Sequence, residues 1–248
     1  MTTTTANLVN PVNWKPANGI KPIDEQIDLL GKMFGLETAP SLKYARKASR
    51  TFTPPLRPVS LMAVLSSTAF SKLHHKMPCV HNVYCRTIEQ LHKKIEAREA
   101  RFVDHAPDQL KPHCFIYEKQ WAEQGFKLLE QRQPTCILVV PAHVGQVYKA
   151  DQTGLRTRDT YHVTEYGMDA LMISSIILTH SEKIFGSKMD DIAIPALGNE
   201  HSPKNDGQFT HTPVYRWFRG KLHFGFVKSS EIQGERFVAA SWYLMAKT

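Results

Sequence analysis

The chain has 248 residues, of which 42% are hydrophobic and 22% are charged, which is typical of a globular protein. No apolar run approaches the roughly 18 residues that a membrane-spanning helix needs, and the Thr-rich start lacks the features of a secretory signal. We therefore expect a cytoplasmic protein with reduced cysteines. The cysteines are Cys79, Cys85, Cys114 and Cys136.

Positive charge is concentrated in one part of the chain. The net charge is +8, but the segment 43–101 contains twelve Lys and Arg and only three Glu, which gives this segment +9 and leaves −1 for the rest. Such asymmetry points to an anionic partner rather than to general solubility. We expect that partner to be nucleic acid or an acidic protein surface, and not a membrane.

Residues 1–22 are rich in Thr and Pro, and we expect a disordered arm there, followed by one domain over 23–248. A helix is predicted from Ile23, because Pro22 suits a helix start and apolar residues then recur at helical spacing. The proline-rich stretch 53–58 is a candidate sub-boundary, because prolines end helices.

The segment SLKYARKASR predicts a helix capped by Ser41. Its cations recur at i, i+3, i+4 and i+7, which places them on one face of the helix. These cations are Lys43, Arg46, Lys47 and Arg50. They repel one another, and a phosphate backbone would relieve that repulsion and release counterions. A solvated face, or ion pairs to Asp24 and Glu25, is the structural alternative.

Two more helices are predicted before the β-rich region. Residues 61–73 have the composition of a small apolar helix, and Thr87 to Gln90 form a capping box that would open another. The second helix would turn Ile88, Leu91 and Ile95 inward. Further cations would continue the basic surface: Arg57, Lys93, Lys94, Arg98 and Arg101.

The C-terminal half predicts mostly strands. A strand, a helix and the strand CILVV, stopped by Pro141, follow one another and predict parallel pairing through a crossover. The apolar helix expected after Thr164 belongs in the core. A short strand, a hairpin around Arg219 and Gly220, and a final strand follow. We therefore expect an α+β fold, with a helical basic N-terminal half packed on a mixed β-sheet in the C-terminal half.

The predicted hairpin interleaves basic and aromatic residues, and strand alternation puts Phe224 and Phe226 on one face. Aromatic rings with adjacent cations stack bases and hold phosphates. The hairpin residues expected to bind nucleic acid are Arg216, Trp217, Arg219, Lys221, Phe224 and Phe226. Burial of the rings in an aromatic core is the structural alternative.

Two resemblances bear on these expectations. RWF at 216–218 and FGFV at 224–227 resemble the first two strands of cold-shock domains, which implies a surface for single-stranded nucleic acid. His223 stands where that family has glycine, Leu222 stands where it has lysine, and the residues after Val227 are too few to complete its barrel.

In the C-terminal half, the strings VVPAHVGQ, LTHSEKI and GNEHSPKNDGQF resemble accessory proteins of bacterial conjugative plasmids and genomic islands. This resemblance implies a mobile-element setting and assigns no catalytic residue.

Two sets of residues offer metal chemistry. Metal-capable side chains cluster in the basic region, at His74, His75, Cys79, His81 and Cys85. Their spacing matches no standard zinc site, so we expect neither a metal nor another cofactor. The acids from which a cation site would be built are Glu165, Asp169, Asp190, Asp191, Glu200 and Asp206. Helix caps and turns are the structural alternative for these acids.

The sequence thus favours a non-catalytic, nucleic-acid-binding accessory or regulatory protein of a bacterial mobile element, in contact with DNA or RNA. One alternative is a metal-assisted phosphodiesterase or nuclease, in which Glu200 and His201 form the most site-like pair. Another is an inhibitor that presents the basic face to an acidic protein of a conjugation or defence machine.

Overall fold

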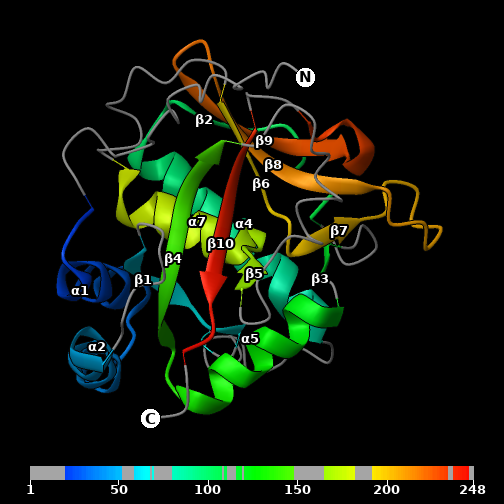
Figure 1. Ribbon diagram of the computed structural model, residues 1–248. Helices are drawn as coiled ribbons and strands as arrows, with labels where there is room; N and C mark the ends of the chain where they lie inside the picture. Colours follow the sequence, from blue (N-terminus) through cyan, green and yellow to red (C-terminus); the bar gives the residue numbers. More distant parts are fainter. Residues whose placement is uncertain are drawn as a thin grey trace, which may run out of the picture.

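A computed structural model describes most of the chain. The described residues are 20–51, 59–67, 69, 80–107, 109–110, 116–118, 120–147, 165–181, 192–233 and 237–245. Within them the chain forms five α-helices and two sheets, with helices mostly N-terminal and strands mostly C-terminal (Figure 1). The expected α+β class is confirmed. The predicted arm (except 20–22) and the candidate sub-boundary 53–58 lie outside these residues.

The first two helices form where the sequence predicts them. Helix α1 (Ile23–Phe34) follows Pro22 and buries Ile27 and Leu30. Helix α2 (Ala39–Thr51) begins before Ser41, so the predicted cap is wrong. Ser41 instead lies buried inside the helix, where its hydroxyl donates a hydrogen bond to the carbonyl oxygen of Ile137 at 2.6 Å.

The next two predicted helices are corrected. Ser60–Leu65 forms strand β1 rather than a helix, because this short apolar run is buried by pairing with a neighbouring strand. Helix α4 (Val80–Arg98) begins before Thr87, whose hydroxyl donates to the carbonyl oxygen of Val83 within the helix. The capping box is therefore wrong. The predicted inward residues are buried: Ile88, Leu91 and Ile95.

The first sheet is antiparallel, in the order β1-β4-β10-β5. The new strands are β4 (Ile137–Val147), β10 (Val238–Tyr243) and β5 (Glu165–Gly167). The sequence predicted that Pro141 stops this strand, but β4 continues through Pro141 to Val147. Pro141 lies opposite Leu61 of β1. On the other side of β4, pairing with β10 begins only at the next residue, Ala142. A proline is tolerated in a strand where no neighbouring strand needs a hydrogen bond from its backbone nitrogen.

The second sheet has the order β2-β9-β8-β7-β3, with β6 also paired to β8. Its strands are β2 (Phe102–Asp104), β3 (Ile116–Glu118), β6 (Ile192–Pro195), β7 (Asn199–His201), β8 (His211–Phe218) and β9 (Lys221–Lys228). The parallel pair of β2 with β9 makes this sheet mixed.

The predicted parallel pairing of β3 with β4 across helix α5 (Gln120–Arg132) is wrong. Strand β3 pairs with β7, whereas β4 pairs with β1 and β10, so the two strands belong to different sheets.

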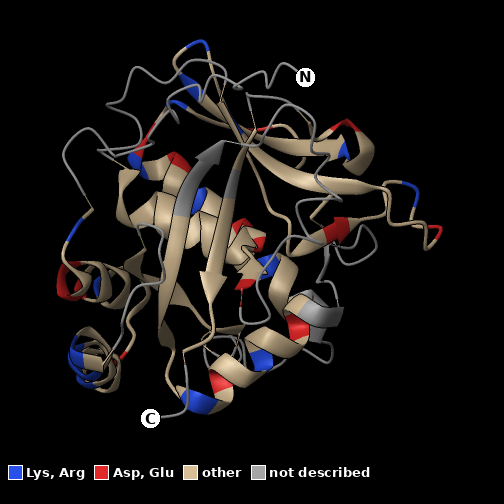
Figure 2. Ribbon diagram, in the orientation of Figure 1, with Lys and Arg blue, Asp and Glu red and all other residues tan. Residues whose placement is uncertain are grey.

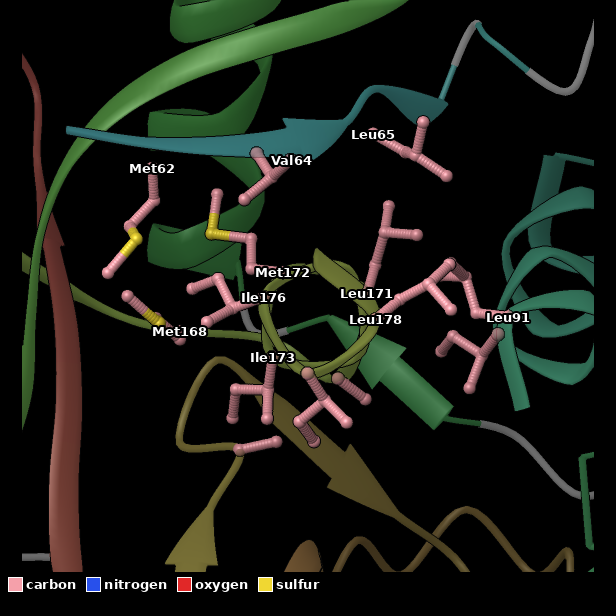
Figure 3. Packing of buried hydrophobic residues seen from close by; sticks show 14 of the residues in the cluster. Met62, Val64, Leu65, Leu91, Met168, Leu171, Met172, Ile173, Ile176 and Leu178 are labelled. Carbon is pink, nitrogen blue, oxygen red and sulfur yellow. The ribbon is translucent and has the colours of Figure 1, made fainter. Parts of the chain in front are cut away.

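Helix α7 (Ala170–Thr179) lies between the two sheets, and all its residues are buried, as predicted for the most apolar helix. Ser175 accepts a hydrogen bond from the amide of Leu65 in β1, while neighbouring Ser174 contacts the hydroxyl of Tyr215 in β8. Figure 3 shows the surrounding apolar side chains. Asp169, and not Thr164, caps the helix by accepting from the amide of Met172.

Candidate nucleic-acid interface

The outward face of α2 carries the predicted basic side chains. Ala45 and Ala48 are buried, so small residues hold the helix close to the body of the protein. The opposite face is exposed and consists of Lys43, Arg46, Lys47 and Arg50, which we call the α2 basic face. Figure 2 shows these cations at the lower left of the view.

The α2 basic face has no neutralising partner within the described part of the chain. Helix α2 contains no acid, and none of the ion pairs between described residues involves its four cations. The alternative of ion pairs to Asp24 and Glu25 therefore does not occur there. Within the described residues, this face is therefore open to water, salt and external anions.

The cations of α4 and of the turn that follows it differ from those of α2, because they contact the protein's own groups. Lys93 pairs with Glu89 at 2.8 Å, and Arg101 pairs with Glu99 at 2.8 Å. The Arg101 guanidinium, as a hydrogen-bond donor, holds the pKa of Glu99 below its ordinary value. Exposed pairs of this kind contribute only about 0–1 kcal/mol, so a phosphate can compete for the cations.

The other cations of this set contact apolar or sulfur atoms. The ammonium of Lys94 lies over the ring of Phe34, 5.4 Å from its centroid, and a guanidinium nitrogen of Arg98 lies 3.7 Å from the sulfur of Met33. Arg57 is outside the described residues. In the part of the chain that the structure describes, the predicted basic surface thus divides into the α2 basic face, which has no ion pair, and cations that already contact the protein's own groups.

The hairpin is confirmed, but its aromatic face is turned inward. Trp217 and Phe224 are buried in the core, and Phe226 is half-buried with its ring stacked on His201 at 3.8 Å. The prediction that Trp217 and Phe224 stack bases is therefore wrong, because neither ring faces solvent. The cold-shock-like strings form the aromatic core hairpin that the sequence left as the alternative.

The opposite face of the hairpin is solvated. Arg216 lies opposite His223 in the register, and Phe218 lies opposite Lys221, so these cross-strand pairs share one face. Arg219 and Gly220 both have positive φ, 51° and 70°, as a two-residue turn between twisted strands requires. We call this the outer hairpin surface, formed by Arg216, Phe218, Arg219, Lys221 and His223.

Phe218 is an exposed aromatic ring among cations. Its side chain is 37% exposed, and the guanidinium carbons of Arg216 and Arg219 lie 4.9 and 5.0 Å from the ring centroid. Sequence analysis did not assign Phe218 to the site. Strand alternation from Arg216 was the signal that could have found it, because it places Phe218 on the cationic face.

A second histidine completes this surface. His105 follows β2, and its Nε2 lies 2.6 Å from Nδ1 of His223, with the two rings stacked 4.9 Å apart. The parallel pairing of β2 with β9 brings the histidines together across 118 residues. No local sequence pattern could have predicted that contact.

A buried polar network lies behind the outer hairpin surface. His92 of α4 joins Asp104 of β2 at 2.9 Å and the Tyr215 hydroxyl at 3.1 Å, and that hydroxyl lies 2.5 Å from Ser174. Burial raises the pKa of Tyr215 above its ordinary value. Because Tyr215 and Ser174 are fully buried, the network joins elements of the core and does not form an open catalytic site.

The described acids and metal-capable residues are hydrogen-bonded to other groups of the protein or lie in its helices and strands. Glu165 accepts a hydrogen bond from Ser241 at 2.6 Å, Asp169 caps α7, and Asp206 accepts from the amide of Gln208 in a loop. Glu200 lies half-buried in β7, and Cys85 is buried on α4. No three of the described His, Cys, Asp and Glu side chains gather in a metal-binding group. The structure does not describe His74, His75, Cys79, Asp190, Asp191 or the side chain of His81.

Comparisons with known proteins give no relative: no protein-family model, curated protein or solved structure matches the chain. The class of protein is therefore defined by its own features, an α+β fold with two cationic surfaces. No helix in the described segments has the length and apolar character to cross a membrane.

Proposed function

We propose that this chain is a non-catalytic, nucleic-acid-binding accessory or regulatory protein, acting in the bacterial cytoplasm in the setting of a mobile element. The observation that carries the proposal is the α2 basic face, four exposed cations with no ion pair among the described residues. The resemblance of three C-terminal strings to accessory proteins of plasmids and genomic islands supports the proposed setting.

The α2 basic face fits the repeat of a phosphate backbone. Its cations extend over eight residues of helix, from Lys43 to Arg50, and the seven steps between them cover about 10 Å at 1.5 Å per residue. One strand of a duplex presents about three phosphates over that length. Each phosphate that a cation neutralises releases a condensed counterion, so binding should weaken as salt rises.

The nuclease alternative requires acids that converge on a cation. Among the described acids, Glu165, Asp169 and Asp206 instead accept hydrogen bonds from the protein's own groups. The inhibitor alternative uses the same basic face on an acidic protein. Capture of partners with and without nuclease treatment separates this alternative from the proposed function, because a protein partner would persist after the treatment.

The test measures affinity for labelled DNA and RNA by fluorescence anisotropy over a series of salt concentrations. Replacing all four α2 cations with Ala should lower the magnitude of the slope of log K against log salt by about two to three, at roughly 0.7 to 0.9 for each of about three phosphates lost. Affinity at low salt should fall by at least tenfold. The helix should still form, since alanine has the highest helix propensity.

The matched control removes four exposed lysines from other elements, Lys32, Lys127, Lys204 and Lys228. This variant has the same net charge as the α2 variant, and its salt slope should change by less than one. Equal losses in the two variants would show that only net charge matters. Absence of binding at low salt and micromolar protein would overturn the proposed function.

A further inference from the structure

The contacts of His105 and His223 determine which ring nitrogens carry hydrogen in this pair. The carbonyl oxygen of Phe218 lies 3.2 Å from Nε2 of His223, and because a carbonyl only accepts, this nitrogen carries a hydrogen. Nδ1 of neutral His223 is then an acceptor, and Nε2–H of His105 donates to it across 2.6 Å. The remaining nitrogen of exposed His105, Nδ1, can take a further proton without breaking this hydrogen bond.

The surroundings of the pair are cationic. Burial is the main cause that lowers the pKa of His223, and the charges of His105, Lys221 and Arg216 act in the same direction, whereas the hydrogen bond to the Phe218 carbonyl opposes them. Among the described residues, the carboxylates near β2 are already engaged, because Asp104 accepts from the amide of Ala106 and contacts His92, and Glu99 pairs with Arg101. An added proton is therefore opposed by like charge, and a bound phosphate would remove that opposition.

Phe218 indicates the kind of nucleic acid. An unpaired base has a free face that can stack on an aromatic ring, whereas bases in a duplex are stacked on one another. A base stacked on Phe218 would place its phosphates beside Arg216, Arg219 and Lys221. Charge and an exposed ring on one face together favour single strands.

We propose that the outer hairpin surface is a contact for single-stranded nucleic acid, and that binding there takes up a proton at the His105–His223 pair. This inference rests on the proposed function, and it names the form of nucleic acid and a pH dependence that the α2 basic face does not supply. The α2 basic face and the hairpin turn lie at opposite ends of the view in Figure 2, so each can be altered separately.

The experiment measures binding of a labelled oligothymidylate 15-mer and of a duplex of equal length, at pH 8, 7 and 6 and constant ionic strength. The single strand should bind more tightly than the duplex, and its affinity should rise about tenfold for each unit by which binding raises the pKa of the pair. Calorimetry in two buffers of different ionisation enthalpy should show fractional proton uptake near pH 6.5.

Three variants separate stacking from proton uptake. Phe218→Leu, which keeps an apolar side chain but loses the aromatic face, should weaken single-strand binding roughly tenfold and leave duplex binding unchanged. His105→Gln, which keeps a donor but cannot take a proton, should bind as the parent does at pH 8 and lose the rise at pH 6. The third combines both changes and should show both losses. His105 and Phe218 are exposed, so these variants should melt as the parent does.

Controls come from elsewhere on the surface. Leu128→Ala removes another exposed large side chain, 40% exposed on α5, and His211→Gln removes a histidine at the far end of β8. Neither should change single-strand preference or pH dependence. A pH dependence that survives in His105→Gln overturns the proton uptake, and equal single-strand and duplex binding overturns the stacking contact. Both results leave the proposed function standing, whereas no binding at low salt removes it.

Discussion

His201 is a buried histidine without the partners that such a residue usually has. Its side chain is 0% exposed, it stacks on Phe226, and neither ring nitrogen has a hydrogen-bond partner in the described structure. Burial, with a smaller contribution from the charge of His211, lowers its pKa to about 4. His201 therefore stays neutral in the folded protein at a pH where the unfolded chain already binds the proton.

This difference predicts a loss of stability in mild acid. Because the folded pKa lies below the unfolded value, the stability is fully present above about pH 6.5 and is lost as pH falls toward 4, by up to about 3 kcal/mol. Urea unfolding at pH 7, 5.5 and 4.5 measures this loss. In His201→Phe, which keeps a ring against Phe226, that share of the pH dependence should disappear. A variant with an undiminished loss would contradict the assignment.

At the scale of elements, helix α5 packs closely against strand β5. A Cβ atom added at Gly125 would lie 2.5 Å from the ring of Tyr166, which is stacked on the ring of Trp242 at 4.7 Å. Tyr166 therefore cannot swing away without disturbing the first sheet. Gly125 allows this approach, although glycine is a weak helix former.

We predict that Gly125→Ala destabilises the protein by about 1–3 kcal/mol, the usual cost of overpacking. This loss should exceed the gain of up to about 1 kcal/mol that alanine gives over glycine in a helix. Gln124→Ala, at an exposed position of the same helix, is the control and should be neutral or slightly stabilising. Thermal melting of both variants checks the prediction, and an equal melting temperature for Gly125→Ala and the parent would refute it.

The sequence predicted elements well where their signal is local. The periodic apolar residues of α1 and α5 and the turn residues Arg219 and Gly220 all led to the observed elements. It failed where the outcome depends on a distant partner. The run at 61–65 has no period that separates a strand from a helix, and its pairing with β4 decides the matter.

The candidate site shows the same division. The α2 basic face followed from spacing within one helix, and its exposure is as expected. The hairpin was found, but which of its faces meets solvent depends on α4 and α7, which contact Phe224 and Tyr215 on the inner face, so Trp217 and Phe224 were assigned to the wrong side. His105 was missed because β2 and β9 meet only in the folded chain.

At the scale of the whole molecule, helix α7 connects the two sheets through a shared core. It hydrogen-bonds to β1 on one side and to β8 on the other, and its side chains belong to the main core cluster. Figure 3 shows Met172 directed toward Val64 of β1 and Leu178 toward Leu91 of α4. Neither sheet can lose this helix and keep its buried face.

We therefore predict a single cooperative unfolding transition, in which circular dichroism and tryptophan fluorescence coincide. Fluorescence samples both sheets, because Trp242 lies in the first and Trp217 in the second. Leu171→Ala should lower the free energy of unfolding by about 2–5 kcal/mol and keep the two transitions coincident. Separate transitions would mean that the sheets unfold independently.

The pairing of β2 with β9 also sets when the outer hairpin surface becomes complete. During synthesis, His105 is added to the chain 118 residues before His223. The two histidines can come into contact only after that whole intervening segment has been made. The α2 basic face needs less of the chain, since Ser41 of that helix is held by Ile137. Contacts between residues so distant in sequence form slowly. A newly made chain would therefore acquire its charged helix first and its paired histidines last.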